Sequence, residues 1–121
     1  MKTFKTIISS IIAICFFTNV QAQTGTTDSI KVYGECGMCK SRIEKTALKV
    51  EGIATANWSE SSKMLTVVYD SSKTDLLDNL QKKIAAVGHD TEKYTAPDKV
   101  YNKLPGCCHY DRKVVPTPIK D

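Results

Sequence analysis

Apolar residues along residues 30–95 recur at two different spacings, and this pattern constrains the fold more than any other feature of the chain. Residues 40–50 and 73–87 carry them every three or four positions, which is typical of amphipathic helices. Four shorter segments alternate apolar and polar residues, as half-buried strands do, the last of them more weakly. These predicted strands are residues 30–33, 53–59, 63–69 and 89–95.

The predicted segments follow one another as strand-helix-strand-strand-helix-strand, with short connections. This order predicts an α+β fold of the ferredoxin-like βαββαβ type, in which both helices cover one face of an antiparallel sheet. Within the second strand, Ala54, Ala56 and Trp58 are expected to share the buried face. The helices are expected to bury two stripes, formed by Ile43, Ala47 and Val50 and by Leu76, Leu80, Ile84 and Val87.

The N-terminal end of the chain has the features of a secretory signal peptide, predicted over residues 1–22. Lys2 and Lys5 precede an apolar stretch at residues 7–17, and Ala22 supplies a small residue at the cleavage position. The alternative is a signal anchor that stays in the membrane. Because the formal net charge of +4 includes both of these lysines, the remaining chain lacks the dense basic face of a nucleic-acid-binding protein. We expect export across the inner membrane to a bacterial periplasm, with residues 23–29 as a flexible leader.

Four cysteines follow the signal peptide, in two close pairs far apart in the sequence: Cys36 with Cys39, and Cys107 with Cys108. An even number of cysteines in an oxidising compartment favours disulfides first. Adjacent cysteines have Cα atoms about 3.8 Å apart, below the usual disulfide range of about 4.4–6.8 Å, so a Cys107–Cys108 bond is disfavoured. The two remaining pairings both tie the tail to the first pair. The alternative is that Cys107 and Cys108 bind metal, assisted by His109.

The first pair, Cys36-Gly37-Met38-Cys39, lies between the first predicted strand and the first predicted helix. Unpaired N–H groups at a helix start favour anions, so the pKa of the Cys39 thiol, and also that of Cys36, is expected to be lowered. Lys40 and Arg42 add positive charge nearby. Two thiolates at this spacing can converge on one soft cation, and they favour Cu(I), Zn(II) or Hg(II) over Mg(II) and Ca(II).

Residues 32–45 (Val-Tyr-Gly-Glu-Cys-Gly-Met-Cys-Lys-Ser-Arg-Ile-Glu-Lys) resemble the metal loop and first helix of heavy-metal-associated domains, the copper-chaperone-like and mercury-binding modules. The similarity extends over residues 29–94. It implies that Cys36 and Cys39 are metal ligands in an exposed site, from which the ion passes to a partner by ligand exchange. It also implies that the loop holding His89 lies beside the cysteine loop, where a neutral imidazole would be a third ligand.

These features predict a heavy-metal-associated domain over residues 30–95 and a C-terminal extension, residues 96–121, that carries Cys107, Cys108 and His109. The expected function is that of an exported metallochaperone or scavenger, not an enzyme, with Cu(I) ahead of Zn(II) and Hg(II). Its partners would be the metal ion, a membrane metal transporter or that transporter's metal-binding domain, and a second copy in a metal-bridged homodimer. The alternatives are a periplasmic thiol–disulfide oxidoreductase and a disulfide-braced interaction domain.

Overall fold

The computed structural model describes residues 25–112 and 117–118, and the predicted signal peptide lies outside these residues. None of the helices in this described part has the length and apolar content needed to cross a bilayer. The elements, in chain order, are β1 (Thr26–Lys31), α1 (Gly37–Leu48), β2 (Ile53–Trp58), β3 (Met64–Tyr69), α2 (Leu76–Ala86), β4 (Tyr94–Thr95), α3 (Asp98–Tyr101), the 3₁₀ turn η1 (Gly106–Cys108) and β5 (Thr117–Pro118).

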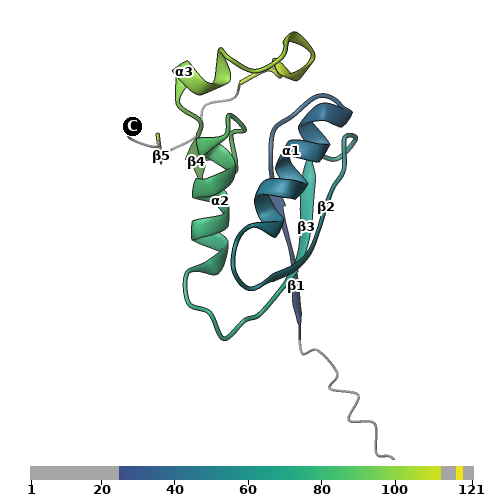
Figure 1. Cartoon of the computed structure of the whole chain (residues 1–121), viewed down its shortest axis with the longest axis vertical. Coiled ribbons are helices and arrows are strands. Elements are labelled where there is room, and N and C mark those ends of the chain that lie inside the picture. The colour runs from purple at the N-terminus through teal and green to yellow at the C-terminus, as the bar shows by residue number, and fades with distance from the viewer. Residues whose placement is uncertain (1–24, 113–116, 119–121) are drawn as a thin grey trace, which may run out of the picture.

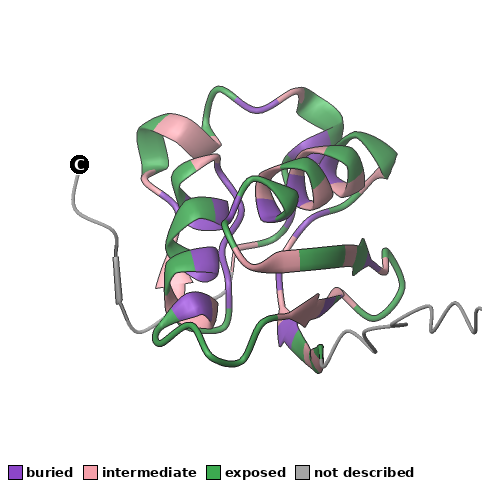
Figure 2. Ribbon diagram, turned by 60° about the horizontal axis from the view of Figure 1, so that its bottom comes forward, coloured by how far each residue is buried: buried purple, intermediate pink, exposed green. Residues whose placement is uncertain are grey.

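The first six elements confirm the predicted βαββαβ order and the ferredoxin-like fold. The sheet is antiparallel in the order β1-β3-β2, and α1 and α2 pack side by side over one of its faces (Figures 1 and 2). The core lies between these two layers. The predicted stripes of both helices contribute to it, except for Val87, which is half-buried and lies outside the core. Fully buried core residues include Ile43, Trp58, Leu65, Leu80 and Ile84.

The first strand begins four residues earlier than the sequence pattern indicates. Residues 26–29 belong to β1 and pair with β3, so the prediction that they form a flexible leader is wrong. Two contacts hold them: the Ser29 and Thr66 hydroxyls lie 2.9 Å apart, and Tyr69 Oη donates a hydrogen bond to Asp28 at 2.6 Å. The segment is polar because it borders solvent, and pairing with β3 outweighs its low hydrophobicity.

A register shift changes which side chains of β2 face the core. Ala56 is half-buried and Trp58 is fully buried, as predicted, but Ala54 is exposed. The shift lies between Ile53 and Thr55, where the pairing with β3 is irregular. Because one extra residue in a strand reverses the alternation of its side chains, the prediction for Ala54 is wrong.

The fourth strand of the predicted sheet is reduced to a single bridge. Val32 pairs with Thr91 in an isolated antiparallel bridge, and the Asp90 carbonyl accepts a hydrogen bond from the Tyr33 N–H at 2.8 Å. β4 instead pairs in parallel with β5. His89 and Asp90 are fully buried and direct their side chains into contacts with α1 and the C-terminal extension. This stretch therefore joins the extension to the domain and does not continue the sheet.

The C-terminal extension folds back against the domain, as Figure 1 shows. It begins with the short helix α3. After it, Leu104, Cys108 and Tyr110 are buried and join the hydrophobic core. Gly88, which ends α2 with φ +111°, leaves space for Leu104, whose side chain would lie 2.9 Å from a Cβ atom at position 88. The extension thus continues the core and holds η1 against the start of α1.

Candidate metal centre

Cys36 and Cys39 lie where the chain passes from β1 into α1. Cys36 immediately precedes α1 in an extended conformation (φ −134°, ψ 177°), and its carbonyl accepts a hydrogen bond from the backbone N–H of Lys40 at 3.0 Å. Cys39 lies in the first turn and is fully buried. A Cβ atom at Gly34 would lie 3.0 Å from the Trp58 ring and 3.1 Å from the Cβ atom of Cys39, so the loop packs this closely only without a side chain there.

Four sulfur atoms converge here, because η1 brings Cys107 and Cys108 against the start of α1. Cys36 Sγ lies 3.2 Å from Cys107 Sγ and 3.5 Å from Cys108 Sγ. It lies 3.6 Å from Cys39 Sγ, and the two sulfurs of the extension are 4.0 Å apart. The thioether of Met38 lies 3.6 Å from Cys107 Sγ. All four cysteines are free. They form what we call the sulfur cluster, in which Cys36 contacts each of the other three.

The acidity of the sulfur cluster is concentrated at Cys36. A hydrogen bond from the backbone N–H of Cys39, together with those from the thiols of Cys107 and Cys108, lowers the pKa of the Cys36 thiol to about 6. Burial raises the pKa of Cys39 to about 12, so the prediction of a lowered pKa is confirmed for Cys36 and wrong for Cys39. The hydrogen bond that the Cys107 thiol donates to Cys36 raises the pKa of Cys107, and burial raises the pKa of Cys108.

One of the two basic side chains expected near the site reaches the sulfurs. Arg42 Nη1 lies 3.5 Å from Cys108 Sγ and 3.3 Å from Nε2 of His89. Lys40 instead donates to the Trp58 carbonyl at 2.7 Å and pairs with Glu44 at 2.6 Å. The positive charge that faces the sulfur cluster directly therefore comes from Arg42.

The structure does not place His89 as a metal ligand. The residue is fully buried, its Nδ1 lies 2.9 Å from the Tyr33 carbonyl, and its Nε2 faces Arg42. A neutral ring that donates from Nδ1 and accepts at Nε2 satisfies both contacts, which leaves no free lone pair for a metal. Burial lowers the pKa of His89 to about 4. In this structure His89 therefore contacts Arg42 and the Tyr33 carbonyl and not the sulfur atoms.

His109 also lies apart from the sulfurs. Its side chain is exposed, and its ring contacts that of Tyr101 with centroids 5.1 Å apart. Among the described residues, the group placed to share a metal ion consists of Cys36, Cys107 and Cys108, with ligand atoms within 4.8 Å of one another. The structure thus brings the predicted cysteines together and leaves both predicted histidines outside.

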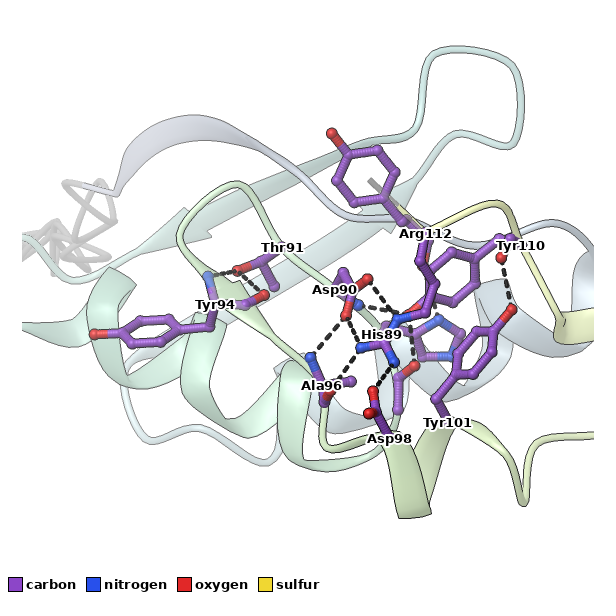
Figure 3. A network of polar contacts seen from close by, with 11 residues as sticks. His89, Asp90, Thr91, Tyr94, Ala96, Asp98, Tyr101, Tyr110 and Arg112 are labelled. Carbon is purple, nitrogen blue, oxygen red and sulfur yellow. Dashed lines mark hydrogen bonds and ion pairs between the residues drawn. The ribbon is translucent and has the colours of Figure 1, made fainter. Parts of the chain in front are cut away.

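A buried ion pair fixes the C-terminal extension in this position. Asp90 is fully buried, and its carboxylate accepts hydrogen bonds from Arg112 Nε at 3.0 Å and Nη2 at 2.7 Å. The same carboxylate accepts the Ala96 N–H at 2.7 Å, and Arg112 Nη1 reaches Asp98 at 2.6 Å (Figure 3). Two oxygens held by two guanidinium nitrogens give a directional contact, so Asp90 and Arg112 define how the extension sits.

Tyr110 adds a second attachment beside this ion pair. Its hydroxyl donates to the Gly88 carbonyl at 2.7 Å and accepts the Asp90 N–H at 2.8 Å (Figure 3). Its ring stacks on His89 with centroids 5.7 Å apart. We call Asp90, Tyr110 and Arg112 the anchoring network. The sequence did not predict this network, because Tyr110 and Arg112 lie 20 and 22 positions after Asp90 and no sequence motif connects them. The sole signal was the position of the acidic Asp90 shortly after a predicted helix.

Comparison with known proteins agrees with this geometry. The family model described as the heavy-metal-associated domain matches residues 35–90, which include Cys36, Cys39 and the whole of both main helices. These residues belong to the heavy-metal-associated domain family. The match ends at Asp90, so the heavy-metal-associated domain as the family defines it does not include Cys107 and Cys108. No curated protein sequence matches the chain.

Solved structures with this fold include a metallochaperone and parts of two P-type ATPases. The CopZ metallochaperone is 27% identical with a TM-score of 0.51, over 55% of this chain and 98% of its own. The N-terminal domain of a potential copper-translocating P-type ATPase from Bacillus subtilis, solved in its Cu(I)-loaded state, is 25% identical with a TM-score of 0.51, over 55% and 84%. The water-soluble region of the P-type ATPase CopA from the same organism is 27% identical with a TM-score of 0.51, over 58% and 46%.

Proposed function

We propose that this protein binds a soft metal cation through the thiolates of Cys36 and Cys39 and acts as a metallochaperone or scavenger. The observation that carries the proposal is the convergence of free cysteine sulfurs at the start of α1 in a heavy-metal-associated domain. Cys36, with its lowered pKa, supplies a thiolate near neutral pH, and a bound cation would displace the proton of Cys39.

Cu(I) is the favoured cargo, with Zn(II) and Hg(II) as alternatives. Thiolates prefer soft cations, and the sulfur cluster contains no oxygen or nitrogen ligand among the described residues. Two of the similar structures are a metallochaperone and the N-terminal domain of a potential copper-translocating ATPase in its Cu(I)-loaded state. Their likeness to this chain supports copper more directly than zinc.

The partner follows from the same likeness. A membrane metal transporter, or its metal-binding domain, would exchange the ion with Cys36 by ligand displacement, since this thiol is only half-buried. A second copy bridged by the metal is a further partner. The predicted signal peptide supports export, and we propose that the protein acts in a bacterial periplasm as a binding protein that does not catalyse a reaction.

Titration with Cu(I) against a competing chelator, under reducing and anaerobic conditions, tests this site. We expect the wild-type protein to take Cu(I) from the chelator and the Cys36→Ser/Cys39→Ser variant to bind it at least about 100-fold more weakly. The expected size follows because changes next to a metal ligand already cost about 10–100-fold, and loss of the ligands themselves costs more. Equal affinity in the two proteins would refute the assignment of this pair.

Thiol–disulfide exchange is the second candidate function, and one observation favours it. Cys36 combines a pKa lowered to about 6 with a sulfur contact of 3.2 Å to the exposed Cys107, an arrangement that also suits an attacking thiolate. Reduction of insulin by dithiothreitol separates the candidates, with a thioredoxin as positive control. We expect no acceleration by this protein, and turnover that depends on Cys36 would favour the oxidoreductase.

A further inference from the structure

We propose that the C-terminal extension supplies the second half of the metal site, so that Cys107 and Cys108 bind the soft cation together with Cys36 and Cys39. The proposal rests on the function proposed above, because it extends the same site. It assigns a role to residues that lie beyond the family match, which ends at Asp90. The ligand class is a thiophilic cation held by three or four sulfurs instead of two.

The spacing of the sulfurs carries the proposal. In a tetrahedral site with metal–sulfur bonds of about 2.3 Å, neighbouring sulfurs lie about 3.8 Å apart, whereas a linear pair at that bond length would be about 4.6 Å apart. The four sulfur contacts of the cluster range from 3.2 to 4.0 Å. The Cys36–Cys39 separation of 3.6 Å is also shorter than a linear site needs. The cluster is therefore arranged for more than two ligands around one ion.

The position of the two extension sulfurs is fixed by the fold. Cys108 is fully buried and packs in the hydrophobic core, and Tyr110 beside it is 4% exposed. The anchoring network then holds the chain from position 110 to 112 against the domain (Figure 3). Ligands held in place before the ion arrives lose little conformational entropy on binding. A tethered second thiol pair therefore acts at a high effective concentration.

Charge around the cluster is also consistent with several thiolates. Each added thiolate brings negative charge into a partly buried place, which needs compensation. The guanidinium of Arg42 lies 3.5 Å from Cys108 Sγ. The backbone N–H of Cys39, at the start of α1, donates a hydrogen bond to the Cys36 sulfur. His89, which contacts Arg42 at 3.3 Å, keeps that guanidinium directed at the cluster.

The arrangement gives the site a closed side and an open side. Cys39 and Cys108 are buried, whereas Cys107 is exposed and lies beside Met38, which is 54% exposed. An incoming ligand from a partner can therefore reach the ion from the side of Cys107, and it would displace that thiolate before it displaces the half-buried Cys36. A cation held on its other side by buried sulfurs leaves slowly, which favours retention of the metal over rapid transfer.

Competitive Cu(I) titration of the full chain, under reducing conditions, tests the proposal with three variants. The Cys107→Ser/Cys108→Ser variant should bind Cu(I) weaker by on the order of 100-fold or more, as expected for loss of a tethered second pair. Cys107→Ser alone, at an exposed position, should also weaken binding by about tenfold or more, and it controls for misfolding caused by substitution of the buried Cys108. His109→Ala, next to the cluster but outside it, should leave the affinity unchanged.

The outcomes separate this proposal from the previous one. Wild-type affinity in both extension variants, together with loss of binding in Cys36→Ser/Cys39→Ser, would overturn the role of the extension and leave the two-cysteine site intact. No Cu(I) binding by the wild type, or full binding without Cys36 and Cys39, would overturn the proposed function and this inference with it. Circular dichroism of each variant confirms that the compared proteins are folded.

Discussion

Replacing Arg112 with methionine should lower the free energy of unfolding by about 3–5 kcal/mol, the usual cost of removing one partner of a buried ion pair. Asp90 is fully buried, and Arg112 is its charged partner, with 21% of the Arg112 side chain exposed. Without the guanidinium, the carboxylate keeps the Ala96 N–H at 2.7 Å as a polar contact but has lost its charged partner. Desolvation of an uncompensated charge would then oppose folding of the extension onto the domain.

Urea denaturation followed by Trp58 fluorescence measures this change. A double variant, Asp90→Asn/Arg112→Met, is the matched control: it removes the charge and the partner together and should recover much of the lost stability. The same Asn can still accept the Ala96 N–H. A loss below about 1 kcal/mol in the single variant, or no recovery in the double variant, would mean that the ion pair does not fix the extension.

Acidification should destabilise the protein through His89 by about 3 kcal/mol. Burial lowers the pKa of His89 from 6.5 to about 4, so the unfolded chain binds a proton at a higher pH than the folded one. The contribution is therefore complete above about pH 6.5 and is lost as the pH falls toward 4. The charged and polar groups that face the ring are Arg42 from α1, the Tyr33 carbonyl, Asp90 and the ring of Tyr110.

The free energy of unfolding, measured by urea between pH 7 and pH 4, gives this dependence. The His89→Gln variant serves as the reference, because the carboxylates with lowered pKa values, such as Glu44, titrate in both proteins and cancel in the difference. The wild type should lose about 1.4 kcal/mol per pH unit more than the variant across the window between the two pKa values. If the unfolding free energies of the two proteins fall in parallel with pH, His89 has the same pKa in the folded and unfolded states, which would contradict this prediction.

The sequence pattern predicted the main fold because apolar spacing records which faces are buried. Leu80 and Ile84 in α2, and Leu65 and Val67 in β3, lie in the core as their periodicity indicates. The errors occur where long-range pairing overrides local character. Residues 26–29 are polar yet join the sheet through β3. His89 and Asp90 turn their side chains toward α1 and the extension, and Thr91 contributes a single bridge.

The sequence predicted that the cysteines of the candidate site lie together, and it did not predict their surroundings. Spacing identified Cys36 and Cys39, and disulfide geometry placed Cys107 and Cys108 near them under either pairing. The directions of the thiol pKa shifts depend on burial, which spacing does not reveal, and this explains the error at Cys39. The pairing of Asp90 with Arg112 depends on how the extension folds back, and a single sequence holds no signal for such a contact.

X-ray absorption at the copper edge of the Cu(I)-loaded protein tests the central claim most directly, because it counts the atoms bound to the ion. We predict about three to four sulfur neighbours per copper and no nitrogen neighbour, since both histidines lie outside the sulfur cluster. In the Cys107→Ser/Cys108→Ser variant the count should fall to about two. A wild-type spectrum with two sulfurs, or with an imidazole nitrogen among the neighbours, would contradict it.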